Sequence, residues 1–197
     1  MDSSLLAIGV FAVAALILLG SLWWLVPTLS GLPWVPTRPQ RIRKALQLAR
    51  LQPGEVVIDL GAGDGRALCI AAREFGAYAT GIEISPVHCL IGWLRARLTG
   101  LGDRVRIRWG DFCRADLSQA DVVFAYLTSR QALRLQPHLV SQLRPGTRLV
   151  TVSFEFEGWQ PVAFDPEDLL FLYSMPPQPG GLDPFLAQND QRVADAG

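Results

Sequence analysis

The sequence predicts an α/β fold in which seven strands form a mostly parallel sheet with helices on both faces, preceded by one N-terminal transmembrane helix. Two observations carry this prediction. Beyond residue 40, short runs rich in valine and isoleucine alternate with stretches of helical character, which is typical of a parallel sheet covered on both sides. Before residue 30, an uncharged apolar run is long enough to cross a bilayer as a helix. The 197 residues leave room for one ordinary domain besides that helix.

The apolar run covers residues 5–26, which contain no charged residue. As a helix it would be about 33 Å long, close to the thickness of a bilayer core. Trp23 and Trp24 lie where aromatic side chains meet lipid headgroups, and Pro27 would end the helix. A cleaved signal peptide is the alternative, but the run has no positive charge before it and no small-residue cleavage site after it. We therefore expect residues 1–29 to be a transmembrane anchor with the lipid bilayer as its partner.

The residues after the anchor predict the topology and the domain boundaries. Four basic residues follow within about twenty positions, and the positive-inside rule then places the domain in the cytoplasm and the N-terminus outside. Residues 30–40 contain three prolines and predict a stiff linker. The folded domain is expected at 41–175, and the tail at 176–197, which is rich in proline and glycine, is expected to be irregular. The basic residues are Arg38, Arg41, Arg43 and Lys44.

Within the domain, turn residues and changes of hydrophobic period separate the elements. The turn at Gln52, Pro53 and Gly54 divides a first helix from the first strand, and a glycine-rich segment at 61–65 divides that strand from the second helix. Helices are expected at 41–51, 66–75, 86–98 and 131–143. Strands are expected at 55–60, 77–82, 105–109, 122–126 and 147–154, and two shorter strands at 160–164 and 169–174 are expected to close the sheet as an antiparallel hairpin.

Composition excludes several classes of function. The 18 Lys plus Arg residues balance the 18 Asp plus Glu residues, so the surplus of cations that non-specific nucleic-acid binding needs is missing. We expect no nucleic-acid partner. The three cysteines contain no CxxC pair and the two histidines no HxxxH motif, so neither a disulfide framework nor a metal site is expected.

The clearest chemical signal is the glycine-rich turn that follows the first strand. Gly61, Gly63 and Gly65 allow the backbone to turn tightly and a ligand to approach the start of a helix without meeting a Cβ atom. The spacing is GxGxG, not the GxGxxG of dinucleotide sites, which disfavours NAD. Asp59 and Asp64 place negative charge at this turn, which suits a ligand that carries an ammonium or sulfonium group. A tight turn without a ligand is the alternative.

Two more acidic residues follow the next two strands. Glu83 ends the second strand, where a carboxylate can accept hydrogen bonds from both hydroxyls of a ribose. Asp111 follows the third strand, where it can accept from an adenine amino group while Phe112 packs on the ring. Either acid alone is more often a solvated loop residue or a helix cap. Three acids at the carboxyl ends of three successive parallel strands are expected to meet at one edge of the sheet and to form one site.

These residues resemble a known superfamily. The segments that carry the resemblance are Asp59 to Arg66, Gly81-Ile82-Glu83, Gly110-Asp111 and Asp121-Val122-Val123, and they are similar to motifs of the class I, seven-strand S-adenosylmethionine-dependent methyltransferases. The resemblance implies a Rossmann-like fold, a methyltransferase activity and S-adenosylmethionine as cofactor. A module that binds this cofactor without catalysis is the non-enzymatic alternative.

The resemblance also implies a role for each site residue. The turn formed by Gly61, Ala62, Gly63 and Gly65 would face the methionine end of the cofactor, and Asp59 and Asp64 would hold its ammonium group. Glu83 would bind the ribose, and Asp111 with Phe112 the adenine. Tyr126, at the end of the fourth strand, is the candidate catalytic residue that lines the methyl slot. A tyrosine of the core fits the same position.

A narrower resemblance concerns the acceptor. An apolar N-terminal segment before Pro36-Thr37, the DLGAGDGR string, Tyr126-Leu127 and Pro145-Gly146-Thr147-Arg148 resemble the membrane-anchored lysine methyltransferases of the ATP synthase c subunit and the adenine nucleotide translocase. The similarity covers about residues 36–161, and Ser85 replaces an expected asparagine. The short, Arg-rich chain has a bacterial character, so the expected location is a bacterial inner membrane. The expected acceptor is a lysine of a membrane-associated protein, with a lipid, a quinone or another small membrane-soluble acceptor as the alternative.

Two charge clusters bear on partners. Five acids near the closing hairpin would favour a cationic acceptor, although a solvated acidic face has the same composition. Three arginines alternate along the third strand, where they would protect a sheet edge from pairing or contact anionic headgroups. The acids are Glu155, Glu157, Asp165, Glu167 and Asp168, and the arginines are Arg104, Arg106 and Arg108.

Overall fold

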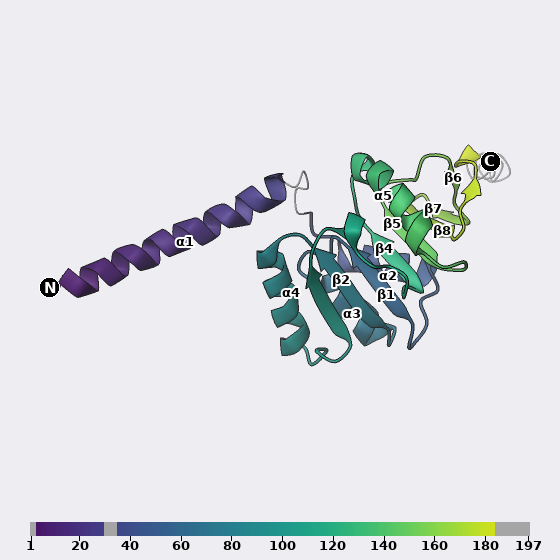
Figure 1. Cartoon of the computed structure of the whole chain (residues 1–197). Coiled ribbons are helices and arrows are strands. Elements are labelled where there is room, and N and C mark those ends of the chain that lie inside the picture. The colour runs from purple at the N-terminus through teal and green to yellow at the C-terminus, as the bar shows by residue number, and fades with distance from the viewer. Residues whose placement is uncertain (1–2, 30–34, 184–197) are drawn as a thin grey trace, which may run out of the picture. The chain divides into compact units, whose positions relative to one another are not determined.

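A computed structural model describes residues 3–29 and 35–183 of the chain. The chain divides between Val35 and Pro36 into two compact units, which are described separately. The first unit contains one helix, α1 (Ser3–Leu29), and the second contains the sheet and all other helices (Figure 1). Most of the predicted linker, residues 30–34, and the end of the predicted tail, residues 184–197, lie outside the described residues.

Helix α1 covers the whole apolar run, so the predicted helix is present. Among the residues that the structure describes, however, no helix is both long and apolar enough to cross a membrane. The predicted transmembrane helix is therefore not supported, and the predicted topology stays a prediction.

The second unit is built on a seven-stranded sheet with the strand order β3-β2-β1-β4-β5-β8-β7. The first five of these strands in chain order are parallel, and β8 is antiparallel to both β5 and β7. Two short strands, β6 and β9, form a separate two-stranded sheet. The strands are β1 (Val56–Leu60), β2 (Tyr78–Glu83), β3 (Val105–Trp109), β4 (Val122–Ala125), β5 (Arg148–Val152), β6 (Trp159–Gln160), β7 (Ala163–Asp165), β8 (Leu170–Ser174) and β9 (Gln178–Pro179).

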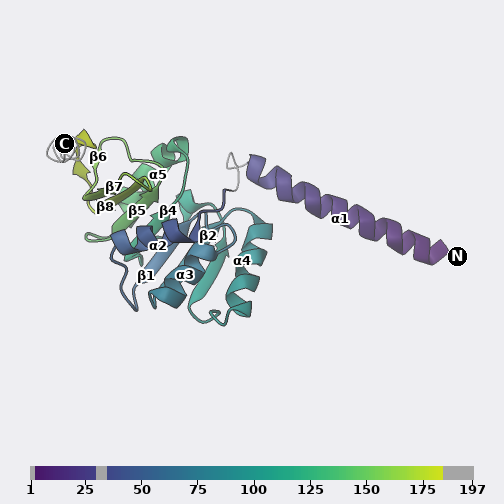
Figure 2. The same cartoon turned by 180° about the vertical axis from the view of Figure 1, so that it is seen from behind.

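Helices cover both faces of the sheet. On one face α2 (Pro39–Leu48), α3 (Arg66–Glu74) and α4 (Pro86–Leu98) pack on side chains such as Val57 and Val150, and α2 and α3 lie in front in Figure 2. On the other face α5 (Ser129–Gln142) packs on Ile58 and Leu149, together with a single 3₁₀ turn, η1 (Phe112–Arg114). Neighbouring residues of β1 thus enter different cores, as the two-residue period of a strand requires.

The predicted fold is confirmed as a mostly parallel seven-stranded sheet with helices on both faces. The strands and helices predicted in the domain form within a few residues of the expected bounds, the accuracy expected at frayed ends. The first hairpin strand, which was expected at 160–164, forms instead at Ala163–Asp165 as β7. Gln178 and Pro179 pair with β6, so the predicted irregular tail contributes a short strand.

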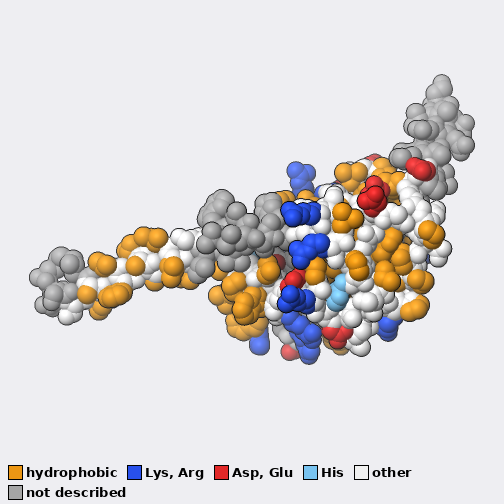
Figure 3. Space-filling model, turned by 45° about the horizontal axis from the view of Figure 1, so that its top comes forward, with side chains coloured by type: hydrophobic (Ala, Val, Ile, Leu, Met, Phe, Trp, Pro, Cys, Tyr) orange, Lys and Arg blue, Asp and Glu red, His pale blue; other side chains and the backbone are white. Residues whose placement is uncertain are grey.

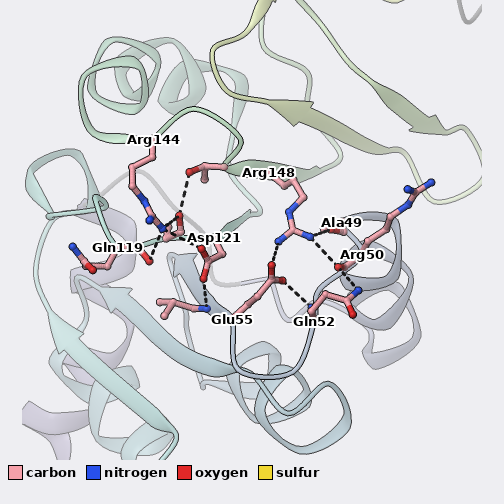
Figure 4. Close-up of polar contacts among 11 residues, drawn as sticks. Ala49, Arg50, Gln52, Glu55, Gln119, Asp121, Arg144 and Arg148 are labelled. Carbon is pink, nitrogen blue, oxygen red and sulfur yellow. Dashed lines mark hydrogen bonds and ion pairs between the residues drawn. The ribbon is translucent and has the colours of Figure 1, made fainter.

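A half-buried and a more exposed ion pair hold the amino end of the sheet (Figure 4). Arg148 of β5 donates to the carbonyl groups of Ala49 (2.8 Å) and Arg50 (2.9 Å) and to Glu55 Oε1 (2.5 Å). Asp121 accepts from the Val56 backbone N–H (2.9 Å) and from the Arg144 side chain (3.0 Å). Asp121 belongs to the motif quoted above, but it lies at the edge opposite to the glycine turn, so its role is structural.

Candidate functional site

The glycine-rich turn lies between β1 and α3, where the strand order reverses between β1 and β4. In open parallel sheets ligands bind at such reversals, beyond the carboxyl ends of the strands. Gly61, Gly63 and Gly65 have φ values of 86°, 54° and 73°, which L side chains rarely adopt. A Cβ atom on Gly61 would meet only Leu127 Cδ2, at 3.9 Å, so this side of the turn is open to a ligand.

Two further glycines let the neighbouring elements approach this turn. A Cβ atom on Gly92 of α4 would lie 3.3 Å from the backbone of Asp64 and Gly65 and 2.3 Å from Ile107 Cδ1. A Cβ atom on Gly81 of β2 would lie 2.5 Å from the Cβ atom of Ala62. The packing roles of Gly81 and Gly92 could not be predicted from the sequence, because the residues around an isolated glycine in a strand or helix do not indicate which element packs against it.

Glu83 connects the turn to the end of β2. Its side chain is buried, Oε2 accepts from the Gly63 backbone N–H (2.7 Å) and Oε1 accepts from the Ser85 backbone N–H (2.8 Å). Each carboxylate oxygen can accept a second hydrogen bond. Glu83 therefore shapes the turn and still has acceptor capacity for the two hydroxyls of a ribose.

Asp59 is a buried carboxyl group on β1, directly before the turn. Within the described residues it makes no hydrogen bond or ion pair with its side chain. Burial, and then the nearby carboxyl groups of Glu83 and Asp64, raise the pKa of Asp59 to about 8. A buried carboxyl group with acids near it and no cation from the described part of the chain is suited to receive a cationic ligand.

Asp64 has different neighbours from those that the sequence suggested. Arg66 donates to its carboxylate from Nε (2.9 Å) and Nη2 (2.7 Å), and Arg95 of α4 donates from Nη2 (2.7 Å). Burial opposes ionisation, but the hydrogen bond from Arg66 and the charges of Arg95 and Arg66 lower the pKa of Asp64. Asp64 thus joins α3, α4 and the turn as an arginine-paired anion, and these contacts favour a positioning role over direct contact with an ammonium group.

Asp111 and Phe112 follow β3 at the same edge of the sheet. Asp111 Oδ1 accepts a hydrogen bond from the Cys113 backbone N–H (2.9 Å) and thereby caps η1. The sequence did not predict this 3₁₀ turn. Phe112 is half-buried against the core on the α5 face. The structure brings both residues to the edge that carries Glu83, since Trp109 pairs with Glu83 in the sheet register.

Tyr126 directly follows β4 and is half-buried against the core on the α2 face. The guanidinium carbon of Arg41 lies 5.9 Å from the centre of its ring. Arg41 also donates from Nε to the Asp168 carbonyl (2.7 Å) and from Nη2 to Ser153 Oγ (2.8 Å). Arg41 therefore joins α2 to the carboxyl ends of β4 and β5, a role that only the assembled fold reveals.

The acids of the hairpin lie at this edge too, because Asp165 and Leu170 pair next to the carboxyl end of β5. Asp165 accepts from the backbone N–H of Glu167 (2.9 Å) and of Asp168 (3.2 Å), and Lys44 pairs with Asp168. Part of the acidic cluster is thus used to cap the β7–β8 turn and to hold α2, which weakens its interpretation as an acceptor surface.

The assembled site fits S-adenosylmethionine. It offers an open glycine turn that a ligand can approach. The buried carboxyl group of Asp59, which no described residue pairs, could bind an ammonium group, and Glu83 could bind the ribose hydroxyls. Asp111 and Phe112 follow the neighbouring strand β3 at the same edge, where they could contact an adenine. Among residues 3–29 and 35–183, no group of three or more His, Cys, Asp or Glu side chains is arranged to hold a metal ion.

Residues 59–163 match the family model of the ANTKMT methyltransferase domain. A protein-lysine N-methyltransferase of Saccharolobus islandicus is 36% identical over 130 residues, which cover 66% of this chain and 81% of that protein. An adenine nucleotide translocase lysine N-methyltransferase of Mus musculus is 32% identical over 139 residues, and a Xenopus laevis lysine N-methyltransferase of the ATP synthase c subunit is 28% identical over 130 residues. The chain covers 60% and 57% of these two proteins, and they cover 70% and 66% of the chain.

Solved structures give the same fold with a related ligand. The crystal structure of an RNA methyltransferase from Salinibacter ruber in complex with S-adenosyl-L-homocysteine has a TM-score of 0.70 and 38% identity, over 72% of this chain and 94% of that chain. A methyltransferase from Geobacter sulfurreducens, also with S-adenosyl-L-homocysteine, has a TM-score of 0.54 and 28% identity, over 66% of this chain and 52% of that one.

Proposed function

Because the chain belongs to the ANTKMT methyltransferase domain family and is an S-adenosylmethionine-dependent methyltransferase, we propose that it methylates lysine side chains of a protein. The single observation in the structure that carries the catalytic part is the buried carboxyl group of Asp59, which lies beside Glu83 and the open glycine turn and has no partner among the described residues. The relatives that act on lysine support the acceptor class.

The proposed reaction needs positioning and charge placement. The cofactor supplies a methyl group on a positively charged sulfur. After losing its proton to solvent, the lysine nitrogen would take this methyl group with its positive charge, and S-adenosylhomocysteine would leave as a neutral thioether. A free lysine titrates near 10.4, so its amine must first lose a proton, which a partly desolvated slot favours. In this proposal Asp59 and Glu83 hold the cofactor, and Tyr126, under the Arg41 guanidinium, lines the slot.

The acceptor is tested by transfer of a labelled methyl group. Membranes and soluble extract are incubated with the full chain and S-adenosylmethionine labelled on its methyl group, and protein, RNA and organic extract are then counted separately. We expect the label in protein, and we expect it to be lost when the labelled lysine is replaced by arginine. Label only in the organic extract would support a lipid or quinone acceptor, and label only in RNA would support an RNA acceptor. Cofactor binding with no label in any fraction would support the non-enzymatic module.

We also propose the cytoplasmic side of a membrane as the location. Cys69, Cys89 and Cys113 are free thiols, which suits a reducing compartment, and the uncharged run at 5–26 suits contact with lipid. A reporter that is active only in the cytoplasm, fused after Gly197, should give signal. An inactive reporter on a chain that is expressed at a normal level would contradict the cytoplasmic placement.

A further inference from the structure

Helix α4 presents its large apolar side chains to solvent and its small ones to the protein. Its buried residues include Gly92 and Ala96, which allow the close approach to the glycine turn. Its exposed large apolar residues follow a spacing of three and four, which places them on one face of the helix. They are Leu90 (56% exposed), Trp93 (48%), Leu94 (41%) and Leu98 (84%). A surface helix normally has the opposite arrangement, so this exposed stripe needs a partner.

The apolar stripe continues toward the carboxyl edge of the sheet. Ile84, just before α4, is 39% exposed, and Trp109, at the end of β3, is 73% exposed. The indole nitrogen of Trp109 donates to the Ile84 carbonyl (2.9 Å), so the ring has a fixed position with its polar atom satisfied. The stripe therefore reaches the edge where Glu83 and Asp111 lie.

Positive charge borders the stripe. The Arg97 guanidinium lies 5.4 Å from the centre of the Trp93 ring. Arg106 and Arg108 are exposed on β3, the edge strand next to α4, on the strand face opposite to Ile107, which meets Gly92 of α4, and within the described residues they donate no hydrogen bond. Figure 3 shows a group of apolar side chains beside a column of Lys and Arg side chains on one face of the folded unit.

We propose that the α4 stripe, defined as Leu90, Trp93, Leu94 and Leu98, docks this unit on the surface of an anionic lipid bilayer. With 13 residues, α4 is about 20 Å long, too short to cross a bilayer, so it lies in the plane of the interface with its apolar face inward. Tryptophan and arginine side chains are suited to this depth, and Arg97 beside the stripe attracts anionic headgroups.

A second copy of the chain is a less suitable occupant of the stripe. In a two-fold dimer the same surface patch meets itself, so the positive charges of the two Arg97 side chains would enter one interface without an opposite charge from the stripe. A bilayer supplies the opposite charge to these side chains. Docking through α4 would also hold the carboxyl edge of the sheet near the headgroups. The inference rests on exposed side chains and does not depend on which acceptor is methylated.

The test uses the full chain with vesicles of phosphatidylcholine alone or of an equal mixture with phosphatidylglycerol, each containing a photoactivatable lipid. After illumination, lipid adducts are mapped along the chain by mass spectrometry. We expect adducts in residues 90–98, and about fivefold more of them in the anionic vesicles, because each nearby arginine adds favourable energy. Leu90→Ser with Leu94→Ser should lower these adducts about tenfold or more.

A matched control uses two exposed apolar residues of α5, Leu133 (54% exposed) and Val140 (55%). Leu133→Ser with Val140→Ser should leave the adducts in α4 unchanged. Calorimetric titration with S-adenosylmethionine checks that each variant is folded, so a failure of docking is distinguished from a failure of the proposed function. Equal adducts in α4 and α5, no effect of the α4 substitutions, or cross-links between two copies at α4 in place of lipid adducts would each overturn the proposal.

Discussion

Glu83→Ala should weaken S-adenosylmethionine binding by about 10- to 150-fold, which corresponds to roughly 1.5–3 kcal/mol. The side chain has two tasks that alanine cannot perform. It accepts hydrogen bonds from the backbone N–H groups of Gly63 and Ser85, and its oxygens can accept further hydrogen bonds from ribose hydroxyls. Without it, two buried donors lose their partner, and the turn loses its connection to β2. Calorimetric titration of the full chain with S-adenosylmethionine measures the effect, and NADH, for which we expect no binding, serves as the comparison ligand.

The matched variant is Glu83→Gln, which keeps the shape and one carbonyl acceptor but replaces the other with an NH₂ group. The NH₂ group would face a backbone N–H, so we expect an affinity between that of the wild type and that of Glu83→Ala. Thermal unfolding of each variant shows how much of the effect is structural. If Glu83→Ala bound S-adenosylmethionine with unchanged affinity, the ribose would have to bind elsewhere.

Local patterns in the sequence predicted most of the fold and the meeting of three acidic residues at one edge of the sheet. The strand runs at 55–60 and 122–126 are strongly apolar, and the glycine turn marks where the first strand meets its helix. Because the carboxyl ends of parallel strands share an edge, the prediction that Asp59, Glu83 and Asp111 come together followed from topology, and the structure shows them at that edge.

The roles of individual side chains were harder to predict, because they depend on residues that are distant in the chain. The anion of Asp64 is paired by Arg95, 31 residues away, and no local pattern distinguishes such an arginine from a solvated one. Arg41 reaches Tyr126 and Asp168 only after α2 packs on the sheet. The reversed polarity of α4 was not predicted, because which face of this helix is buried depends on Gly92 meeting the glycine turn.

The pH dependence of cofactor binding should report the ionisation of Asp59. With a pKa raised to about 8, first by burial and then by Glu83 and Asp64, this carboxyl group is mostly protonated at pH 6–7 in the free protein. A bound ammonium group favours the ionised form, so binding should release a proton. Affinity should therefore rise with pH, by about tenfold between pH 6 and pH 7. Above about pH 8 it should fall again, because the α-amino group of the ligand loses its own charge there.

Folding stability should change in the opposite direction over the same range. Asp59 has an ordinary value of 3.8 in the unfolded chain and a pKa of about 8 in the folded protein, so the folded state binds more protons between these values. The contribution of Asp59 to the free energy of unfolding is then full below about pH 4 and is lost progressively as the pH rises to about 8. Chemical denaturation at several pH values, without the cofactor, measures this loss.

Asp59→Asn separates the two effects, because asparagine has nearly the same shape and does not titrate. The variant should lose the rising limb of the affinity profile while keeping the fall above pH 8 that belongs to the ligand, and its affinity at pH 7.5 should be lower by about 10- to 150-fold. Without the cofactor it should be more stable than the wild type at pH 8, since the cost of ionising a buried carboxyl group is gone. Calorimetric titrations in two buffers with different ionisation enthalpies count the released proton directly. A wild-type protein that releases no proton at pH 6.5, or an asparagine variant that keeps the rising limb, would show that Asp59 does not receive the ammonium group.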